Sequence, residues 1–111
     1  MHQLRIGSET KGVFLSFLST VEENLDQWPN TTLQIMRGRW CLRIERGMLR
    51  DETAHGAVAL HYEGALYFRL STENEEKGID EAVIVFLSCH PTPLGAVRAL
   101  QGYLQSCPFQ E

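Results

Sequence analysis

Apolar side chains recur at steps of three or four residues near the beginning of the chain. Within residues 12–28 they are Phe14, Phe17, Leu18, Val21, Leu25 and Trp28. On an α-helix this spacing places them in one stripe about 100° wide, with Ser16, Glu22 and Asp26 on the far side. The pattern predicts an amphipathic helix that Pro29 terminates, since the residue before a proline is disfavoured in the helical conformation.

After Pro29 the hydrophobic period changes to two, which is typical of half-buried strands. Residues 32–35 and 40–45 alternate in this way, and Arg37-Gly38 allows the chain to reverse between them. Residues 58–62 and 66–70 alternate again on either side of Glu63-Gly64. We therefore expect two hairpins, the second of them turning at Glu63-Gly64.

Three further segments lack a clear alternation. Residues 46–56 have neither period, so a loop and one short helix both remain open. Residues 71–81 hold five acidic side chains against one lysine, which predicts an exposed loop. Residues 82–87 are apolar on both alternations and rich in β-branched side chains. This last run predicts a central strand covered on both faces, or on one face and by a partner subunit.

A second helix is expected at the end of the chain. Thr92-Pro93 is a strong helix start, because the threonine hydroxyl can accept from free backbone N–H groups and proline suits the first helical position. An apolar stripe follows before Pro108, formed by Leu94, Val97, Leu100, Leu104 and Cys107. We predict a single α+β domain over residues 1–111. In it, one antiparallel five-stranded sheet carries the N- and C-terminal helices packed on it, in the order α-β-β-β-β-β-α.

Composition agrees with one ordinary folded domain and suggests no reaction. The chain has 111 residues, of which 43% are hydrophobic and 22% charged, and its formal net charge is −4. The beginning of the chain has no signal-peptide pattern, no run is long enough to span a membrane, and three cysteines form no Cys-x-x-Cys pair. We expect a cytoplasmic protein with reduced thiols and no membrane partner.

The basic side chains are concentrated in the first predicted hairpin and around it. Arg37, Arg39, Arg43, Arg46 and Arg50 lie within fourteen residues and flank Trp40. Arginine interleaved with an aromatic ring can bind nucleic acid, but alternation places Trp40 on the face opposite Arg39 and Arg43, and the acidic net charge argues against such a partner. A solvated basic edge that pairs with an acidic loop or protein is the favoured interpretation.

One polar constellation could support catalysis. His61 and Glu63 precede the predicted second turn, and Tyr67 and Arg69 follow it, so the four side chains could meet across that hairpin. A cross-strand set of charge pairs is the favoured alternative, since no nucleophile accompanies the four. We therefore expect no catalytic residues and no enzymatic activity.

Cofactor and metal sites are also not expected. The glycines never form a dinucleotide-binding or phosphate-loop spacing, so no cofactor is predicted. Cys89-His90 is the one adjacent thiol and imidazole, but neighbours on a strand point to opposite faces. The four histidines show no local metal-ligand spacing, so no metal is predicted, and a site would have to be assembled in three dimensions.

The order of predicted elements resembles the small acidic class I chaperones of type III secretion. The stretches that carry the resemblance are residues 14–28, the two glycine-centred hairpins, and residues 82–104, where an apolar strand leads through Pro91-Thr92-Pro93 into the last helix. The family usually has a helix between its third and fourth strands, where this chain has Glu63-Gly64. Only the segment near Met48 to His55 could take its place.

The resemblance implies a homodimer that holds an extended segment of a secreted protein without using ATP. On this interpretation, residues of the first helix and first hairpin would line the binding groove or its basic border: Phe14, Phe17, Trp40, Leu42, Arg37, Arg39 and Arg43. The intramolecular core is an equally good assignment for the apolar members. An immunity or inhibitor protein that binds a toxin or enzyme is the first alternative function. A small enzyme using His61, Glu63, Tyr67 and Arg69 is the second.

Overall fold

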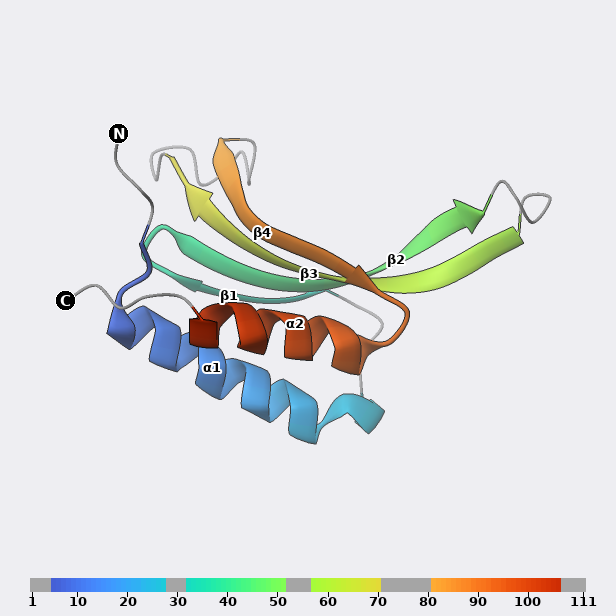
Figure 1. Ribbon diagram of the computed structural model, residues 1–111, viewed down its shortest axis with the longest axis horizontal. Helices are drawn as coiled ribbons and strands as arrows, with labels where there is room; N and C mark the ends of the chain where they lie inside the picture. Colours follow the sequence, from blue (N-terminus) through green and yellow to red (C-terminus); the bar gives the residue numbers. More distant parts are fainter. Residues whose placement is uncertain (1–4, 28–31, 52–56, 71–80, 107–111) are drawn as a thin grey trace.

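Two helices lie on one face of a four-stranded antiparallel sheet in the computed structural model, which describes residues 5–27, 32–51, 57–70 and 81–106 (Figure 1). The strands follow one another in the sheet in chain order. The elements are α1 (Ser8–Glu23), a 3₁₀ turn (Leu25–Gln27), β1 (Leu33–Arg37), β2 (Trp40–Asp51), β3 (Ala57–Arg69), β4 (Ala82–His90) and α2 (Pro93–Ser106). The α+β class with two terminal helices is confirmed, but the sheet has four strands where five were predicted.

Helix α1 begins at Ser8, one turn before the predicted start, and ends at Glu23. Its buried side chains are spaced by three or four residues, and all but the first belong to the predicted apolar stripe: Lys11, Phe14, Leu18 and Val21. Trp28 and Pro29, where the helix was predicted to end, lie outside the described residues. The stripe therefore directs α1 against the sheet, as its sequence indicated.

The first predicted hairpin is confirmed and its second strand is longer than expected. Arg37 pairs with Trp40, and Gly38 adopts a φ of +59°, which a side chain would disfavour. Strand β2 then continues to Asp51 and pairs with β3 along its whole length. The interpretation of residues 46–51 as a loop or helix is therefore wrong, while residues 52–56 lie outside the described residues.

The second predicted hairpin does not exist, because β3 runs through Glu63-Gly64 without turning. Gly64 pairs with Ile44 of β2 and with Ser88 of β4. A Cβ on Gly64 would lie 3.1 Å from the carbonyl oxygen of Ala96 and 3.1 Å from Leu100 Cγ. Gly64 thus allows α2 to approach the sheet closely, whereas the sequence predicted that it would form a turn.

Strand β4 is an edge strand and not the central strand predicted for residues 82–87. Among the described strands it pairs with β3 alone, with an irregularity between Leu66 and Tyr67, while β2 and β3 occupy the middle of the sheet. Coverage on both faces is also wrong, since no residue of β4 is fully buried. The acidic loop predicted over residues 71–81 lies outside the described residues except for Glu81, which is exposed.

Helix α2 begins as predicted, because the Thr92 hydroxyl accepts a hydrogen bond from the Gly95 N–H at 3.1 Å. The core lies between the two helices and the covered face of the sheet, which we define as the face that α1 and α2 pack against. Its buried members are Ile6, Phe14, Leu18, Val21, Trp40, Leu42, Ile44, Leu66, Ala96, Val97, Leu100 and Leu104. Two ring contacts extend this packing, Trp40 edge-on to Phe68 and Phe86 stacked on Tyr103.

Candidate functional site

The opposite side of the sheet, which we call the open face, is covered by neither helix (Figure 1). Strand alternation and the observed register place on it Cys41, Arg43, Glu45, Glu63, Ala65, Tyr67, Ile84, Leu87 and Cys89. Two of the small side chains in its middle, Cys41 and Ala65, are buried, while larger apolar ones on β4 are not. The open face therefore combines a closely packed centre with an unburied apolar border.

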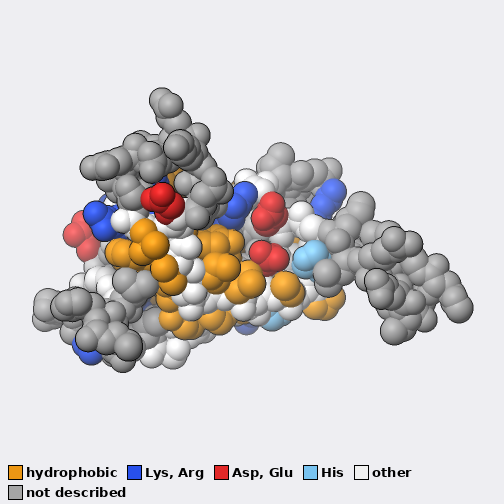
Figure 2. Space-filling model, turned by 90° about the horizontal axis from the view of Figure 1, so that it is seen from above, with side chains coloured by type: hydrophobic (Ala, Val, Ile, Leu, Met, Phe, Trp, Pro, Cys, Tyr) orange, Lys and Arg blue, Asp and Glu red, His pale blue; other side chains and the backbone are white. Residues whose placement is uncertain are grey.

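This border is formed by Ile84 and Leu87. Together with Val83, which projects from the same strand on the other face, we call them the β4 patch. Val83, Ile84 and Leu87 are 39%, 55% and 47% exposed. Seen from above, hydrophobic side chains gather in the middle of the molecule, with acidic and histidine side chains beside them (Figure 2). Exposure of three large aliphatic side chains on one strand is a feature that burial by a partner would explain.

The backbone of β4 has an open side as well. Eight of its nine residues pair with β3 on one side, Val85 falls at the irregularity in register, and no described strand pairs with the other side. Natural sheets commonly protect such an edge with charged side chains, prolines or short strands. Residues 82–90 contain no Asp, Glu, Lys, Arg or Pro. This lack of protection was visible in the sequence, but the apolar run suggested a central strand instead.

The four residues of the predicted catalytic constellation do not meet. His61, Glu63, Tyr67 and Arg69 lie along the single strand β3, so the cross-hairpin contact predicted for them is wrong. His61 and Arg69 are separated by eight strand positions, or about 26 Å of extended chain. Burial, and secondarily the Glu63 carboxylate, raises the pKa of Tyr67 above its ordinary value, so its hydroxyl ionises less readily than that of an exposed tyrosine.

The arginines proposed for partner binding point to different parts of the surface. Arg37 pairs with Glu9 of α1. Arg39 contacts the Leu70 carbonyl oxygen at 3.5 Å, and Arg43 lies on the open face 3.8 Å from Glu45. The first hairpin therefore does not present these three cations as one basic surface.

The apolar residues proposed for a groove lie within or against the core of the single chain. Phe14 and Leu42 are fully buried, Trp40 is nearly so, and Phe17 packs against the same cluster. A partner could reach the buried three only if the helices moved away from the sheet. A partner can contact the β4 patch without such a movement.

Cys89 and His90 point to opposite sides of β4, as alternation predicted. The His90 ring contacts the Ser88 hydroxyl, whereas the Cys89 thiol lies 3.9 Å from a Glu63 carboxylate oxygen on the open face. Within the described part of the chain, one group of side chains could hold a metal ion, formed by His61, Glu63 and Cys89. Sequence spacing could not identify this group, because its members come from two strands.

Comparisons of the chain with models of protein families, with curated proteins and with solved structures found no match. Neither described helix has a stretch long and apolar enough to cross a membrane. The open face and the β4 edge are therefore the features of the described chain from which a function can be inferred.

Proposed function

We propose that this protein is a small protein-binding module that binds an extended segment of another protein along the free edge of β4. The observation that carries the proposal is the combination of an unpaired, uncharged edge with the exposed β4 patch. Backbone pairing would supply affinity, and the alternating side chains would supply specificity.

The chemistry of β4 defines the segment that would fit. An added strand satisfies the N–H and C=O groups on the free side of β4, so the segment must be extended and free of proline where it pairs. Ile84 and Leu87 project on the open face and Val83 on the other, so apolar side chains on both alternations of the segment could bury area against the patch. We therefore expect an uncharged segment of five or six residues, rich in β-branched side chains.

The proposal can be tested by selecting peptides from a display library against the immobilised full-length chain and measuring their affinities. Ile84→Lys places a charge in the centre of the patch and should weaken binding at least about tenfold, which corresponds to about 1.4 kcal/mol. Met36→Lys is the matched control, because Met36 is also exposed but lies on β1 at the other edge of the sheet. It should leave binding unchanged.

Backbone methylation separates strand addition from simple apolar contact. A selected peptide with N-methyl groups on the side that faces β4 should lose binding, whereas methylation on the other side should not affect it. Equal affinities for Ile84→Lys and the wild-type chain, or binding that tolerates both methylation patterns, would contradict the proposal.

A second copy of the chain is the competing occupant of the edge, and light scattering distinguishes it. If the wild-type chain is a dimer that Ile84→Lys converts to monomer, and no peptide is selected, β4 serves self-association and the binding proposal fails. That result would agree with the homodimer predicted from the sequence. A chain that binds peptides with the expected dependence on Ile84 would support the module.

The secretion-chaperone form of the proposal is narrower. It holds that the bound segment belongs to a protein awaiting export, which is kept extended without ATP. The exposed edge strand supports it, since an edge of this kind holds a segment without needing the segment to fold, whereas the second hairpin that carried part of the resemblance is absent. Selected peptides that match the leading segment of a secreted protein would favour this form over a general binding module.

A further inference from the structure

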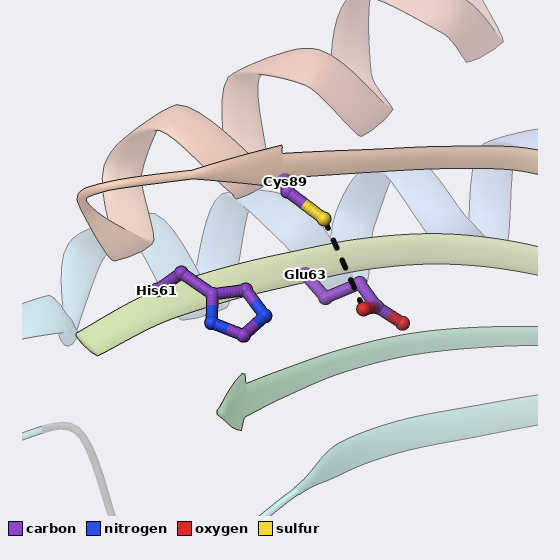
Figure 3. Close-up of side chains that lie close together, drawn as sticks. All are labelled: His61, Glu63 and Cys89. Atoms are coloured by element: carbon purple, nitrogen blue, oxygen red, sulfur yellow. Dashed lines mark hydrogen bonds between the residues drawn. The ribbon is translucent and has the colours of Figure 1, made fainter. Parts of the chain in front are cut away.

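Three metal-binding side chains meet where β3 and β4 run side by side on the open face. His61 and Glu63 are two residues apart on β3, and Cys89 lies directly opposite Glu63 on β4. One nitrogen, oxygen or sulfur atom from each lies within 4.8 Å of the others. The imidazole, carboxylate and thiol occupy neighbouring positions on one side of the two strands (Figure 3).

The His61 ring has the space it needs because β2 carries a glycine opposite it. Gly47 pairs with His61, and a Cβ at position 47 would lie 2.8 Å from His61 Cε1. The ring therefore occupies the space that a side chain on β2 would fill. Its Nδ1 is shielded from solvent and has no hydrogen-bond partner within the described residues. In Figure 3 the other ring nitrogen, Nε2, is the one directed toward Glu63.

The electrostatics around Glu63 favour a cation. Glu45 lies directly opposite Glu63 on β2, and two carboxylates in such a pair destabilise a sheet. Glu45 is balanced by Arg43 at 3.8 Å. Glu63 has no ion pair with a described Lys or Arg, and its hydrogen-bond partner among the described residues is the Cys89 thiol, at 3.9 Å. A bound cation would neutralise Glu63 and relieve its repulsion with Glu45.

The donor set indicates which cation. Nitrogen, oxygen and sulfur ligands together suit Zn²⁺, while Mg²⁺ and Ca²⁺ prefer oxygen alone. Ligand atoms on a tetrahedral zinc lie about 3.3–3.8 Å apart, given bonds of about 2.0–2.3 Å. The 3.9 Å separation of sulfur and carboxylate is close to this range, and the separations to the His61 nitrogen are at most 4.8 Å, so small side-chain rotations would bring the three ligand atoms onto one ion.

We propose that His61, Glu63 and Cys89 bind Zn²⁺, with solvent in the fourth position. Binding displaces the thiol proton of Cys89 to solvent, and the thiolate, imidazole and carboxylate donate to the metal without any change of oxidation state. The ion joins the edge strand β4 to β3 and fixes the end of β4 that leads into α2. The site does not depend on the protein-binding proposal, because it uses none of the three β4 patch residues.

The test is a titration of the reduced full-length chain with Co²⁺, followed by displacement with Zn²⁺. We expect one Co²⁺ per chain, with a thiolate-to-cobalt charge-transfer band that Zn²⁺ abolishes. Cys89→Ser should remove the band. His61→Gln and Glu63→Gln should each weaken Zn²⁺ binding more than about 100-fold, since loss of even an outer partner commonly costs 10–100-fold.

Two variants serve as matched controls. His90→Gln changes the residue next to Cys89 but on the covered side of β4, and Cys41→Ser removes the buried thiol of the same open face. Both should keep the band. Absence of a band in the wild-type chain, or a band that survives Cys89→Ser, would overturn the proposal.

A second measurement does not depend on cobalt spectroscopy. A ligand that binds only the folded state raises the melting temperature. Zn²⁺ should therefore raise the melting temperature of the wild-type chain and of His90→Gln, and a chelator should reverse the effect. Glu63→Gln should show no rise, and circular dichroism before titration verifies that this variant is folded. An equal rise in Glu63→Gln would also reject the site.

Discussion

The two faces of the sheet differ in how completely their apolar side chains are buried. On the covered face, Leu42, Ile44 and Leu66 are fully buried beneath α1 and α2. On the open face, Cys41 and Ala65 are equally buried, but Ile84 and Leu87 next to them are about half exposed. Burial on the open face is thus confined to its centre and does not extend to Met36 on β1 or to Ile84 and Leu87 on β4. The helices bury the whole middle of one face, whereas nothing in the described chain covers the edges of the other.

The covered face should be the more sensitive to a buried charge. Leu100 of α2 is fully buried against the sheet near Gly64, so Leu100→Asp would place an unpaired carboxylate in the core. We expect a loss of at least about 3–5 kcal/mol, which is comparable with the total stability of many domains and should unfold the chain. Circular dichroism and urea denaturation measure the effect.

Leu87→Asp is the matched control, because it introduces the same charge on the open face. Leu87 is 47% exposed, so its substitution should cost less than about 1 kcal/mol and leave the chain folded. If Leu87→Asp unfolds the chain as Leu100→Asp does, the open face is not open in solution and the comparison fails.

Gly64 tests how closely the covered face is packed. In Gly64→Ala the new Cβ would lie 3.1 Å from both the Ala96 carbonyl oxygen and the Leu100 side chain, so α2 must move. We expect a destabilisation of about 1–3 kcal/mol in urea denaturation. Gly102 lies within α2, and the Cβ that Gly102→Ala adds would have no atom within 4 Å. This substitution should instead stabilise the folded chain by up to about 1 kcal/mol. Equal stability of the two variants would show that α2 tolerates a wider spacing.

Elements that begin or end at a local turn or helix-capping signal could be predicted from sequence. Helix α2 starts at Thr92-Pro93, and the first hairpin turns at Arg37-Gly38, because each signal acts through its own backbone. At that turn the apolar positions change from odd numbers, such as Leu33, to even ones, such as Trp40. This change is expected when residues 37 and 40 pair on the same face.

The false turn at Glu63-Gly64 lacks that change of parity. Tyr62, Leu66 and Phe68 are all even-numbered, which is consistent with one uninterrupted strand and could have been recognised. A glycine in a sequence can indicate either a turn or a close approach by a helix. Gly64 serves the close approach of α2.

The His61, Glu63 and Cys89 group could not be predicted in the same way. Its assembly depends on the register between β3 and β4, which are separated by residues 70–81, and no local signal sets that register. The sequence pattern instead favoured grouping His61 and Glu63 with Tyr67 and Arg69, which lie farther along the same strand. Long-range pairing, and not the identity of the residues, was the missing information.

The smallest expected effect is a difference in reactivity between two thiols on the open face. It tests whether one is buried and the other exposed. Cys41 is 1% exposed, whereas Cys89 is exposed. Burial raises the pKa of Cys41, and the nearby Arg43 and Arg69 only partly oppose this. At any given pH, Cys41 therefore holds less of the reactive thiolate than an ordinary cysteine and is also less accessible.

Alkylation rates measured against pH in a Cys107→Ser background would resolve the two thiols. With a chelator present, Cys89 should react rapidly at pH 8, and Cys41, isolated by Cys89→Ser, should react more slowly and gain rate only at higher pH. The alkylation rate of Cys41 should rise at a higher pH than that of an ordinary cysteine, because a thiol with a raised pKa forms its thiolate at higher pH. Rapid alkylation of Cys41 at pH 8 in the folded chain would mean that the centre of the open face is accessible. The distinction between its buried middle and its exposed β4 border would then be lost.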